Sequence, residues 1–335
     1  MKIGIVGAGF MGSTHAAAWV ETPAHLVGIT AETCAECENL ANQYQLEVYP
    51  DLTSMLEHVD VVDICTPTHL HTGMILQSAV AGKHVICEKP LSRTVAEGQQ
   101  AIRACKQAGV KLLVAHVVRF FPQYALAKSA VDEGQIGKPS VIRLSRGSFR
   151  PKKPVGNWFL EESKSGGILM DMMIHDYDYA RWIAGEVVSV YARKISTGHK
   201  EASVEYGLAI LRHKNGALSH IAGGWAYPPP TFRTHIELAG DQGLIEFDSD
   251  DTAPIRDLIR RPTADAPDVG LPSSPTSESP YTTQIKEFYR ALYDGSPVRV
   301  TPEDGLAAVQ IAEAAIQSAE SGLAVEIEPL PEVGS

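Results

Sequence analysis

No stretch of the sequence is apolar for long enough to span a lipid bilayer, so we expect no transmembrane helix. The first residues lack the basic start, apolar stretch and cleavage site of a secretory signal, so we expect none. Positive charge is scarce: 29 Lys and Arg stand against 40 Asp and Glu, a net charge of −11. The densest basic runs, 150–153 and 260–261, are short. This balance argues against nucleic acid or an anionic membrane as partner.

Cysteine is also scarce, with five residues in the chain, an odd number. A chain of this length needs no disulfide framework, so we expect reduced thiols and a cytoplasmic protein. Cys34 and Cys37 form a lone C-x-x-C, whereas a structural zinc site needs a second pair of ligands. His69, His71 and His116 have no recognisable zinc spacing either. We therefore predict no bound metal.

The length of 335 residues exceeds the usual size of one domain, and 44% apolar with 21% charged residues is near the globular average. Up to residue 121, short apolar strands alternate with helical segments, which is typical of a parallel sheet covered on both faces. The expected strands are 2–6, 26–30, 59–65, 85–87 and 112–118. The expected helices run to about residue 20 and over 34–44, 74–81 and 95–108.

Beyond residue 121 longer strand patterns follow one another, which favours an antiparallel sheet. We expect strands at 140–149, 187–195, 205–213, 217–226, 232–239 and 243–248. We expect helices at 124–133, 167–183, 284–292 and 302–322. The stretch 262–280 is rich in Pro, Ser, Thr and Asp and is interpreted as a long surface loop.

A glycine motif opens the first helix: Gly7, Gly9 and Gly12 match G-x-G-x-x-G, with Phe10 and Met11 between them. The motif follows a strand and begins a helix, which is the context that dinucleotide binding requires. The first glycine permits a tight turn, the second lets the backbone approach a pyrophosphate, and the third lets helix and strand pack closely. We predict that this turn, with its helix N-terminus, binds a dinucleotide.

Two strands of the expected parallel sheet end in polar residues, where the ligand crevice of this architecture lies. Thr66 and Pro67 follow one strand, and Glu88, Lys89 and Pro90 follow another. A lysine there can act as an acid or as a fixed charge beside a hydroxyl that loses its proton. The alternative is an exposed loop lysine. Because Pro90 restricts Lys89, we predict a functional lysine and a cis Lys89–Pro90 peptide bond.

Asp171 and His175 stand four residues apart in a helical pattern, which predicts one helix face. A carboxylate beside an imidazole orients the ring and stabilises its protonated form, which suits a base that takes a proton from an alcohol. A structural helix pair is the alternative. Residues 176–179, Asp-Tyr-Asp-Tyr, are interpreted as the solvated side of this helix. Asn157, Trp158 and Tyr227 are candidates for the lining of a polar and aromatic pocket, with ordinary packing as the alternative.

Taken in order, these motifs resemble the glucose–fructose oxidoreductase/inositol dehydrogenase (Gfo/Idh/MocA) family over nearly the whole chain. The matching segments are Gly7–Gly12, Cys65–His71, Gly82–Pro90, His116–Pro122 and Gly166–Asp176. The resemblance implies an NAD(P)-binding Rossmann domain over 1–121. It also implies an α/β domain over 122–335, with an open, mostly antiparallel sheet, for substrate binding and oligomerisation. The implied activity is hydride transfer between NAD(P) and a secondary alcohol of a sugar, cyclitol or related polyol.

By the same resemblance, Lys89, Asp171 and His175 form the catalytic trio and also contact substrate. The implied cofactor contacts are the glycine turn (Gly7, Gly9, Phe10, Met11, Gly12), Ala31, Glu32, Thr66, Pro67, His69, His71, Glu88, Lys89 and Arg119. Asn157 and Trp158 stand where the family presents substrate-pocket residues. His116 and Tyr227 are further candidates for substrate contact. Three rival functions remain: reduction of a keto-sugar or sugar nucleotide, cleavage of a glycoside through transient oxidation, and a non-catalytic regulator that binds NAD(P). The retained catalytic trio argues against the non-catalytic regulator.

The chain departs from the family pattern at the end of the second strand, where Ala31 and Glu32 replace a frequent Asp. No Arg or Lys occurs between Lys2 and Lys83 to pair with a 2′-phosphate, so we predict NAD(H), with tolerance of both cofactors as the alternative. Val117 and Val118 stand where some cyclitol-oxidising members place a polar contact, so a generic sugar is favoured over inositol.

We also expect a homodimer or homotetramer, because the second sheet has few helices after it to cover both faces. The strand at 217–226 carries Leu218, Ile221 and Trp225, and the strand at 232–239 carries Ile236 and Leu238. These residues are interpreted as an open apolar face that binds a second copy.

Overall fold

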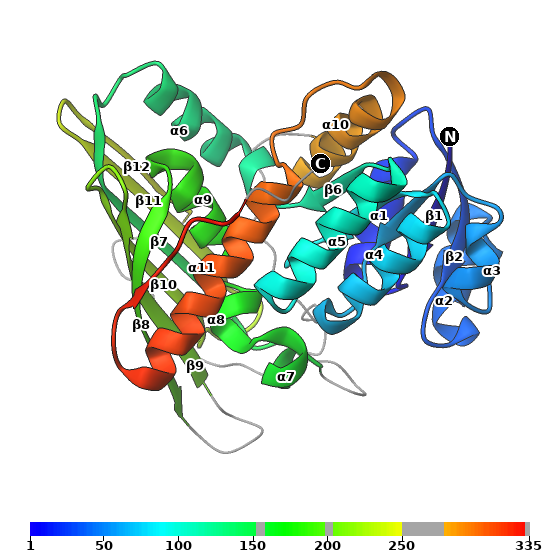
Figure 1. The fold of residues 1–335 in the computed structure, drawn as a ribbon, viewed down its shortest axis with the longest axis horizontal. Helices are drawn as coiled ribbons and strands as arrows, with labels where there is room; N and C mark the ends of the chain where they lie inside the picture. Colours follow the sequence, from blue (N-terminus) through cyan, green and yellow to red (C-terminus); the bar gives the residue numbers. More distant parts are fainter. Residues whose placement is uncertain (152–157, 198–203, 250–277, 332–335) are drawn as a thin grey trace. The chain divides into compact units, whose positions relative to one another are not determined.

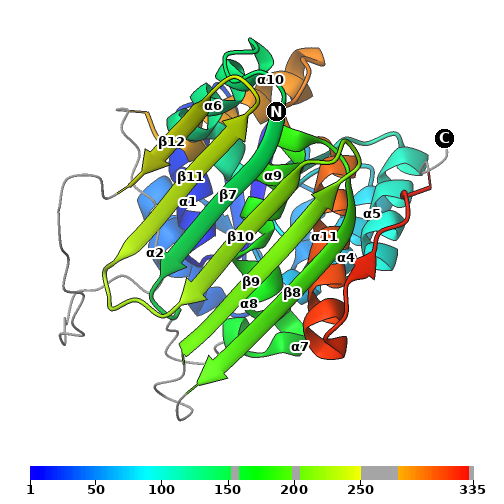
Figure 2. The same cartoon turned by 90° about the vertical axis from the view of Figure 1, so that its left-hand side faces the viewer.

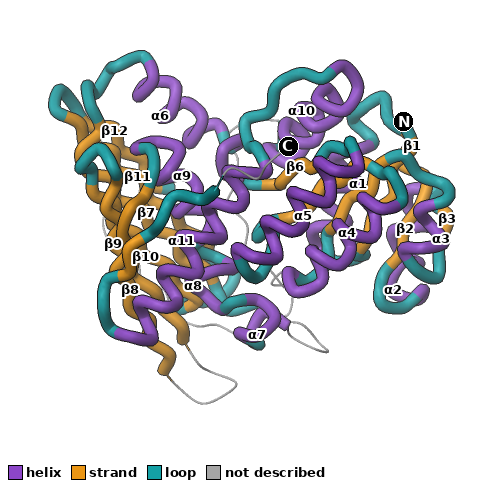
Figure 3. The backbone as a smooth tube through the Cα atoms, viewed as in Figure 1, coloured by secondary structure: helices purple, strands orange, loops and turns teal. Residues whose placement is uncertain are grey.

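The computed structural model describes residues 1–151, 158–197, 204–249 and 278–331 (Figures 1 and 3). It divides into two compact units. The first comprises Met1–Pro122, Ser274–Leu306 and Pro331–Ser335, and the second Gln123–Ser273 and Ala307–Leu330. The expected boundary at residue 121 falls beside Pro122. Residues 274–306, which the sequence analysis grouped with the second domain, lie in the first unit.

The first unit is built on a six-stranded parallel sheet in the order β3-β2-β1-β4-β5-β6. Its strands are β1 (Lys2–Val6), β2 (His25–Thr30), β3 (Glu47–Val48), β4 (Val61–Ile64), β5 (His84–Glu88) and β6 (Leu112–Ala115). Its first helices are α1 (Phe10–Trp19), α2 (Cys34–Tyr44), α3 (Leu52–Leu56), η1 (Thr68–Leu70), α4 (His71–Val80), α5 (Val95–Ala108) and η2 (Val117–Phe120). The predicted Rossmann architecture is confirmed. The order reverses direction at β1 and β4, which is where such sheets bind ligands.

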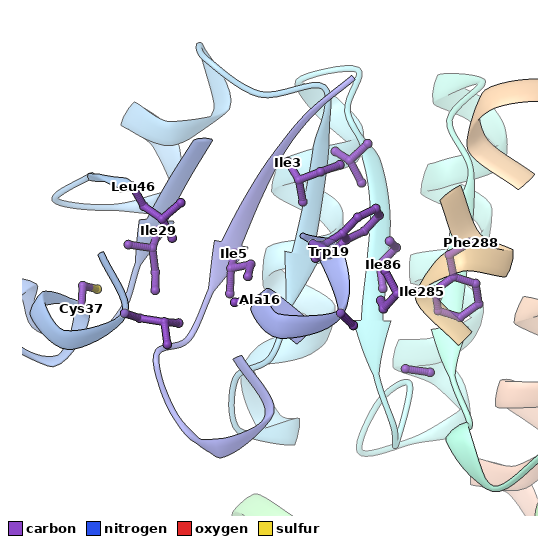
Figure 4. Close-up of a cluster of buried hydrophobic side chains, with 14 of the residues drawn as sticks. Ile3, Ile5, Ala16, Trp19, Ile29, Cys37, Leu46, Ile86, Ile285 and Phe288 are labelled. Carbon is purple, nitrogen blue, oxygen red and sulfur yellow. The ribbon is translucent and has the colours of Figure 1, made fainter. Parts of the chain in front are cut away.

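A helix from the far end of the sequence completes the core of this unit. Helix α10 (Pro280–Asp294) places Ile285 and Phe288 in one buried cluster with Ile3 and Trp19 (Figure 4). All four side chains are fully buried. A backbone carbonyl of α10, that of Ala291, also accepts a hydrogen bond from the Lys111 ammonium. The returning segment is therefore part of the first unit's hydrophobic core.

The second unit is built on a seven-stranded sheet in the order β12-β11-β7-β10-β9-β8-β13 (Figure 2). Its strands are β7 (Pro139–Ser148), β8 (Val187–Thr197), β9 (Val204–His213), β10 (Leu218–Trp225), β11 (Phe232–Gly240), β12 (Leu244–Asp248) and β13 (Val325–Glu326). Its helices are α6 (Pro122–Asp132), η3 (Trp158–Leu160), α7 (Glu162–Ser165), α8 (Gly167–Asp171), α9 (Ile174–Ala184) and α11 (Pro302–Ser321), whose first residues belong to the first unit. Every pairing is antiparallel except β7 with β10, so the sheet is mostly antiparallel, as predicted.

The two faces of this sheet differ in what covers them. Helices α8 and α9 pack on the inner face, where Met173 contacts Gly207 and Gly223 so closely that a Cβ on either glycine would lie 2.6 or 2.4 Å from a Met173 atom. The expected apolar face is corrected here. Ile221, Trp225, Ile236 and Leu238 are buried, whereas Leu218 alone of that set is exposed. In β10 and β11 every second residue faces the helices, and the larger apolar side chains occupy those positions.

Five exposed apolar side chains of the outer face lie on three neighbouring strands. Tyr191 of β8 is paired in register with Ile210 of β9, and Ile195 of β8 with Tyr206 of β9. These four residues, with Leu218 of β10, are each more than a third exposed. We refer to these five residues as the outer apolar patch.

Three further expectations from the sequence need correction. The helix expected over 167–183 is two helices, α8 and α9. Short β3 and α3 were not predicted, and the strand expected to reach residue 118 ends at Ala115 and continues as η2. Most of 262–280 lies outside the described residues.

Across the described part of the chain, no helix combines the length and the apolar character needed to cross a membrane.

The returning helix leads to a test of stability. Phe288→Ala should destabilise the first unit by about 3–5 kcal/mol, because it removes a fully buried aromatic ring and leaves a cavity. Urea denaturation followed by tryptophan fluorescence measures the effect. The control is Tyr293→Ala in the same helix, whose side chain is 74% exposed. Equal stability of the two variants would contradict the assignment of α10 to this core.

Candidate functional site

The glycine turn between β1 and α1 has the shape that a dinucleotide pyrophosphate requires. Gly7 has a φ of +105°, and a Cβ there would lie 2.5 Å from the Cys65 carbonyl oxygen. A Cβ on Gly12 would lie 1.9 Å from the Gly7 carbonyl oxygen, so only glycine fits either position. Gly9 caps α1 without a side-chain hydrogen bond to the first turn, where Phe10 and Met11 follow. The turn therefore presents the backbone N–H groups of a helix N-terminus, which bind phosphate.

The next predicted cofactor residues follow two strands of this sheet, β2 and β4. Ala31, half-buried, and Glu32, exposed, follow β2, and Thr66 and Pro67, both half-buried, follow β4. The exposed His69 lies in η1. Because β1, β2 and β4 are parallel neighbours, their ends meet at one edge of the sheet, the edge of the glycine turn.

His71 is buried, and both its ring nitrogens lie near backbone carbonyls: Nδ1 is 2.7 Å from the oxygen of Pro90 and Nε2 is 2.9 Å from that of Thr66. Burial lowers the pKa of His71 below its ordinary value, although these two carbonyls oppose the shift. The ring thus connects the segment after β4 to the segment after β5. We interpret His71 as a buried structural link between these two segments at the ligand-binding edge of the sheet.

Lys89 follows β5 directly, and the predicted cis Lys89–Pro90 bond is confirmed. The Lys89 side chain is half-buried, whereas Glu88 is almost completely buried. The Glu88 carboxylate accepts a hydrogen bond from the Lys89 backbone N–H at 3.0 Å and faces His15 Nε2 at 3.1 Å. Glu88 therefore directs its carboxylate into the protein. His15 was not among the predicted site residues, although Asp63, its partner, is conspicuous as an acid within an apolar strand.

His116 directly precedes η2 and Arg119 lies within it, and both residues are buried. The Arg119 guanidinium donates to the Arg299 carbonyl at 2.7 Å and is 3.3 Å from the Asp304 carboxylate. These contacts connect η2 to the returning segment of the first unit. They account for the burial of Arg119 by packing, so its predicted cofactor contact remains a prediction.

In the second unit, Asp171 and His175 do not share one helix, which corrects the expectation from their spacing. Asp171 is the last residue of α8, and His175 is the second residue of α9. The chain between them, Met172–Met173, is pressed against the sheet glycines described above. Asp171 is buried and His175 is half-buried. The packing of Met173, rather than helix periodicity, thus determines where the two side chains lie.

The residues next to His175 are buried, not solvated as expected. Asp176 pairs with Arg146 of β7 through two hydrogen bonds of 2.8 Å, from Nε and from Nη2. The Arg146 guanidinium also lies 3.2 Å from the Tyr124 hydroxyl, and the Tyr179 hydroxyl donates to the Tyr124 carbonyl at 3.0 Å. Burial opposes the charge of Arg146, but Asp176 raises the pKa of Arg146 above its ordinary value. This ion pair fixes the first turn of α9 to the sheet.

Of the remaining predicted residues, Trp158 lies in η3 and Tyr227 follows β10. Trp158 begins η3, half-buried, and stacks on Phe159 with ring centroids 4.0 Å apart. Asn157 lies outside the described residues. Tyr227 covers Gly147, whose Cβ would lie 2.1 Å from its ring, and lines a cavity of about 170 Å³ with Tyr206 and His235. Gly147 is paired with Gly224 on the outer face of the sheet, opposite α8 and α9.

Comparison with known proteins agrees with this geometry. Residues 1–116 match the sequence model of an oxidoreductase family with an NAD-binding Rossmann fold, and residues 124–246 match the Gfo/Idh/MocA C-terminal domain. A myo-inositol 2-dehydrogenase of Thermotoga maritima is 31% identical, covering 98% of this chain and 99% of its own. A levoglucosan dehydrogenase of Pseudarthrobacter phenanthrenivorans is 29% identical, and the match covers 95% of this chain and 96% of the relative.

Among solved structures, a levoglucosan dehydrogenase in complex with NADH and levoglucosan superimposes with a TM-score of 0.82 at 26% identity, and the match covers 98% of this chain and 99% of that chain. The chain therefore belongs to the Gfo/Idh/MocA family. It is an NAD-binding oxidoreductase, and its glycine turn has the backbone shape that this cofactor needs.

The buried ion pair beside His175 can be tested for stability. Arg146→Met should cost about 3–5 kcal/mol, because it leaves the Asp176 carboxylate buried without its cation. The control is Arg143→Met in the same strand, whose pair with Glu237 is partly exposed and is worth about 1 kcal/mol or less. Chemical denaturation of the two variants compares them directly. A loss for Arg146→Met no greater than that for Arg143→Met would show that Asp176 finds another partner.

Proposed function

We propose that this chain catalyses hydride transfer between NAD(H) and a secondary hydroxyl group of a sugar or related polyol. The observation that carries the proposal is Lys89, which immediately follows β5 in the same parallel sheet whose first turn is shaped for a dinucleotide. The substrate class is supported by the relatives, which are named as dehydrogenases of myo-inositol and levoglucosan. We assign cofactor binding to the first unit, and substrate binding and self-association to the second.

The proposed roles follow from the chemistry of each side chain. In the direction of oxidation, the His175 imidazole takes the proton of the substrate hydroxyl, and the Lys89 ammonium stabilises the alkoxide that forms. Asp171 orients that imidazole and stabilises it once it is protonated. The bound nicotinamide supplies the acceptor for the hydride. In reduction, His175 returns the proton to the carbonyl oxygen.

Lys89→Ala and His175→Ala should each lower kcat by about 10²–10⁴-fold, because each removes a group that stabilises charge or moves a proton at the reacting carbon. NADH affinity, measured by fluorescence titration, should stay near that of the wild type. The substrate is found from a panel of sugars and inositols with NAD⁺ and NADP⁺, followed at the absorbance of reduced nicotinamide. Lys83→Ala, before the start of β5, is the matched control and should keep full turnover. Wild-type turnover of His175→Ala on its best substrate would refute the assignment.

For the cofactor we propose a preference for NAD(H). Glu32 is exposed just beyond β2, where the adenosine ribose binds in this architecture. Its carboxylate accepts hydrogen bonds from a free 2′-hydroxyl and repels a 2′-phosphate. Glu32→Ser should therefore raise kcat/KM for NADP(H) relative to NAD(H) by about fivefold, the equivalent of about 1 kcal/mol for two charges 4 Å apart in water. A wild-type preference for NADP(H) would mean that a cation reaches this position from elsewhere in the chain.

We also propose that two copies associate through the outer apolar patch, as a homodimer or as a dimer of dimers. Five exposed apolar side chains on neighbouring strands are more than a scatter of single residues, and such patches mark interaction surfaces. Light scattering after size exclusion should give a multiple of the chain mass. Ile210→Arg should shift that mass towards the monomer, whereas Val80→Arg, equally apolar and 89% exposed on α4, should not. A monomeric wild type at micromolar concentration would contradict the proposal.

A cytoplasmic location stays an expectation, which rests on the five unpaired cysteines.

A further inference from the structure

His15 of α1 lies fully buried between two carboxylates. Its Nδ1 is 2.9 Å from Asp63 Oδ2, and its Nε2 is 3.1 Å from Glu88 Oε1. An ionised carboxylate accepts hydrogen bonds and donates none, so both ring nitrogens have to donate. The ring that donates from both nitrogens is the imidazolium. Burial alone lowers the pKa of His15, yet the Asp63 carboxylate raises it well above its ordinary value.

This imidazolium connects three elements of the first unit. Asp63 belongs to β4, Glu88 ends β5, and His15 lies on the helix that starts at the glycine turn. The Trp19 indole N–H also donates to Asp63 at 2.7 Å, so α1 holds Asp63 at two points. On the other side, the second oxygen of Glu88 accepts the backbone N–H of Lys89 at 3.0 Å. An unbroken series of hydrogen bonds therefore runs from Asp63 to the backbone of Lys89.

We propose that His15 is the positioning residue for Lys89: its doubly donating ring holds the Glu88 carboxylate in place, and Glu88 in turn fixes the backbone from which the Lys89 side chain extends. This inference rests on the proposed function only in assigning Lys89 to the reacting centre. Without the imidazolium, Asp63 and Glu88 are two buried like charges, and Glu88 has to turn towards water or take up a proton. Either change releases the Lys89 backbone.

A metal ion is the competing interpretation of the same cluster. Ligand atoms of His15, Asp63 and Cys65 lie within 4.8 Å of one another. One observation favours hydrogen bonding instead. The carboxylate of Asp63 is already the acceptor for two N–H groups, those of His15 and Trp19.

The decisive variants are His15→Gln and Trp19→Phe. Glutamine stays neutral and cannot bridge both carboxylates, so kcat on the best substrate of the panel should fall by about 10²-fold, as expected when a reacting group is misplaced. NADH affinity should be retained, because the glycine turn is untouched. Trp19→Phe removes the other donor to Asp63 and leaves the contact of His15 with Glu88; it should lower the melting temperature but keep kcat. Parallel losses of kcat and melting temperature in both variants would show a merely structural role and overturn the proposal.

Two further measurements keep the proposal testable if His15→Gln does not fold. Nitrogen-15 NMR of the wild-type protein should show a His15 ring that is protonated on both nitrogens throughout neutral pH; a neutral ring overturns the proposal. Glu88→Asp keeps the charge but shortens the side chain, so it should lower kcat as His15→Gln does, and unchanged turnover would overturn it too.

The outcomes separate this inference from the proposed function. Loss of activity in Lys89→Ala with full activity in His15→Gln refutes the role of His15 alone, whereas full activity in Lys89→Ala refutes the function of Lys89 itself. One equivalent of a transition metal in the purified protein would replace the hydrogen-bonded cluster with a metal site and overturn the proposal.

Discussion

Both units depend on the same constraint: an ionised group that is removed from water has to be paired with good geometry. In the first unit the pairing is that of His15 with Asp63 and Glu88, and in the second it is that of Arg146 with Asp176. Each cluster ends one residue away from a proposed reacting group, Lys89 in one case and His175 in the other. A buried charge tolerates few arrangements, so it is well suited to hold the neighbouring backbone in one of them. The polar residues inside this protein thus determine local geometry more than they determine net stability.

How far the sequence predicts this molecule depends on whether local or distant residues decide each feature. The helices over Cys34–Tyr44 and Val95–Ala108 agree with prediction at both ends. In the second case the reasons are local, since Thr94 and Glu97 form a capping box and Gly109 ends the helix in the left-handed conformation. The break after Asp171 was not predicted, because Met172 and Met173 favour helix by themselves and the cause lies in the sheet glycines that receive Met173. The spacing of Asp171 and His175 therefore predicted one helix face, whereas the two residues belong to two consecutive helices.

The same distinction applies to the site. The glycine turn was predicted because its requirements are local: a positive φ at Gly7 and a close approach at Gly12. His15 was interpreted from the sequence as a structural histidine, because its partners are 48 and 73 residues away in sequence. Tyr227 was grouped with the substrate residues on composition alone, and only the alternation of β7 and β10 shows that it lies on the outer face. Family membership, in contrast, rests on several motifs in order, which is a global property that a single sequence displays well.

The first unit is discontinuous, and this affects how the chain acquires its fold on the ribosome. Residues 1–122 emerge first, but Ile285 and Phe288, which complete their hydrophobic cluster, are made only after β7 to β12 of the second unit. Until then the nascent N-terminal part exposes the apolar surface that α10 later covers, next to Trp19. Domains usually fold as units in the order of synthesis. Here the N-terminal unit has all six strands of its sheet early but has to wait for its last helix, so chaperone binding to the early chain is the expected biological cost of this topology.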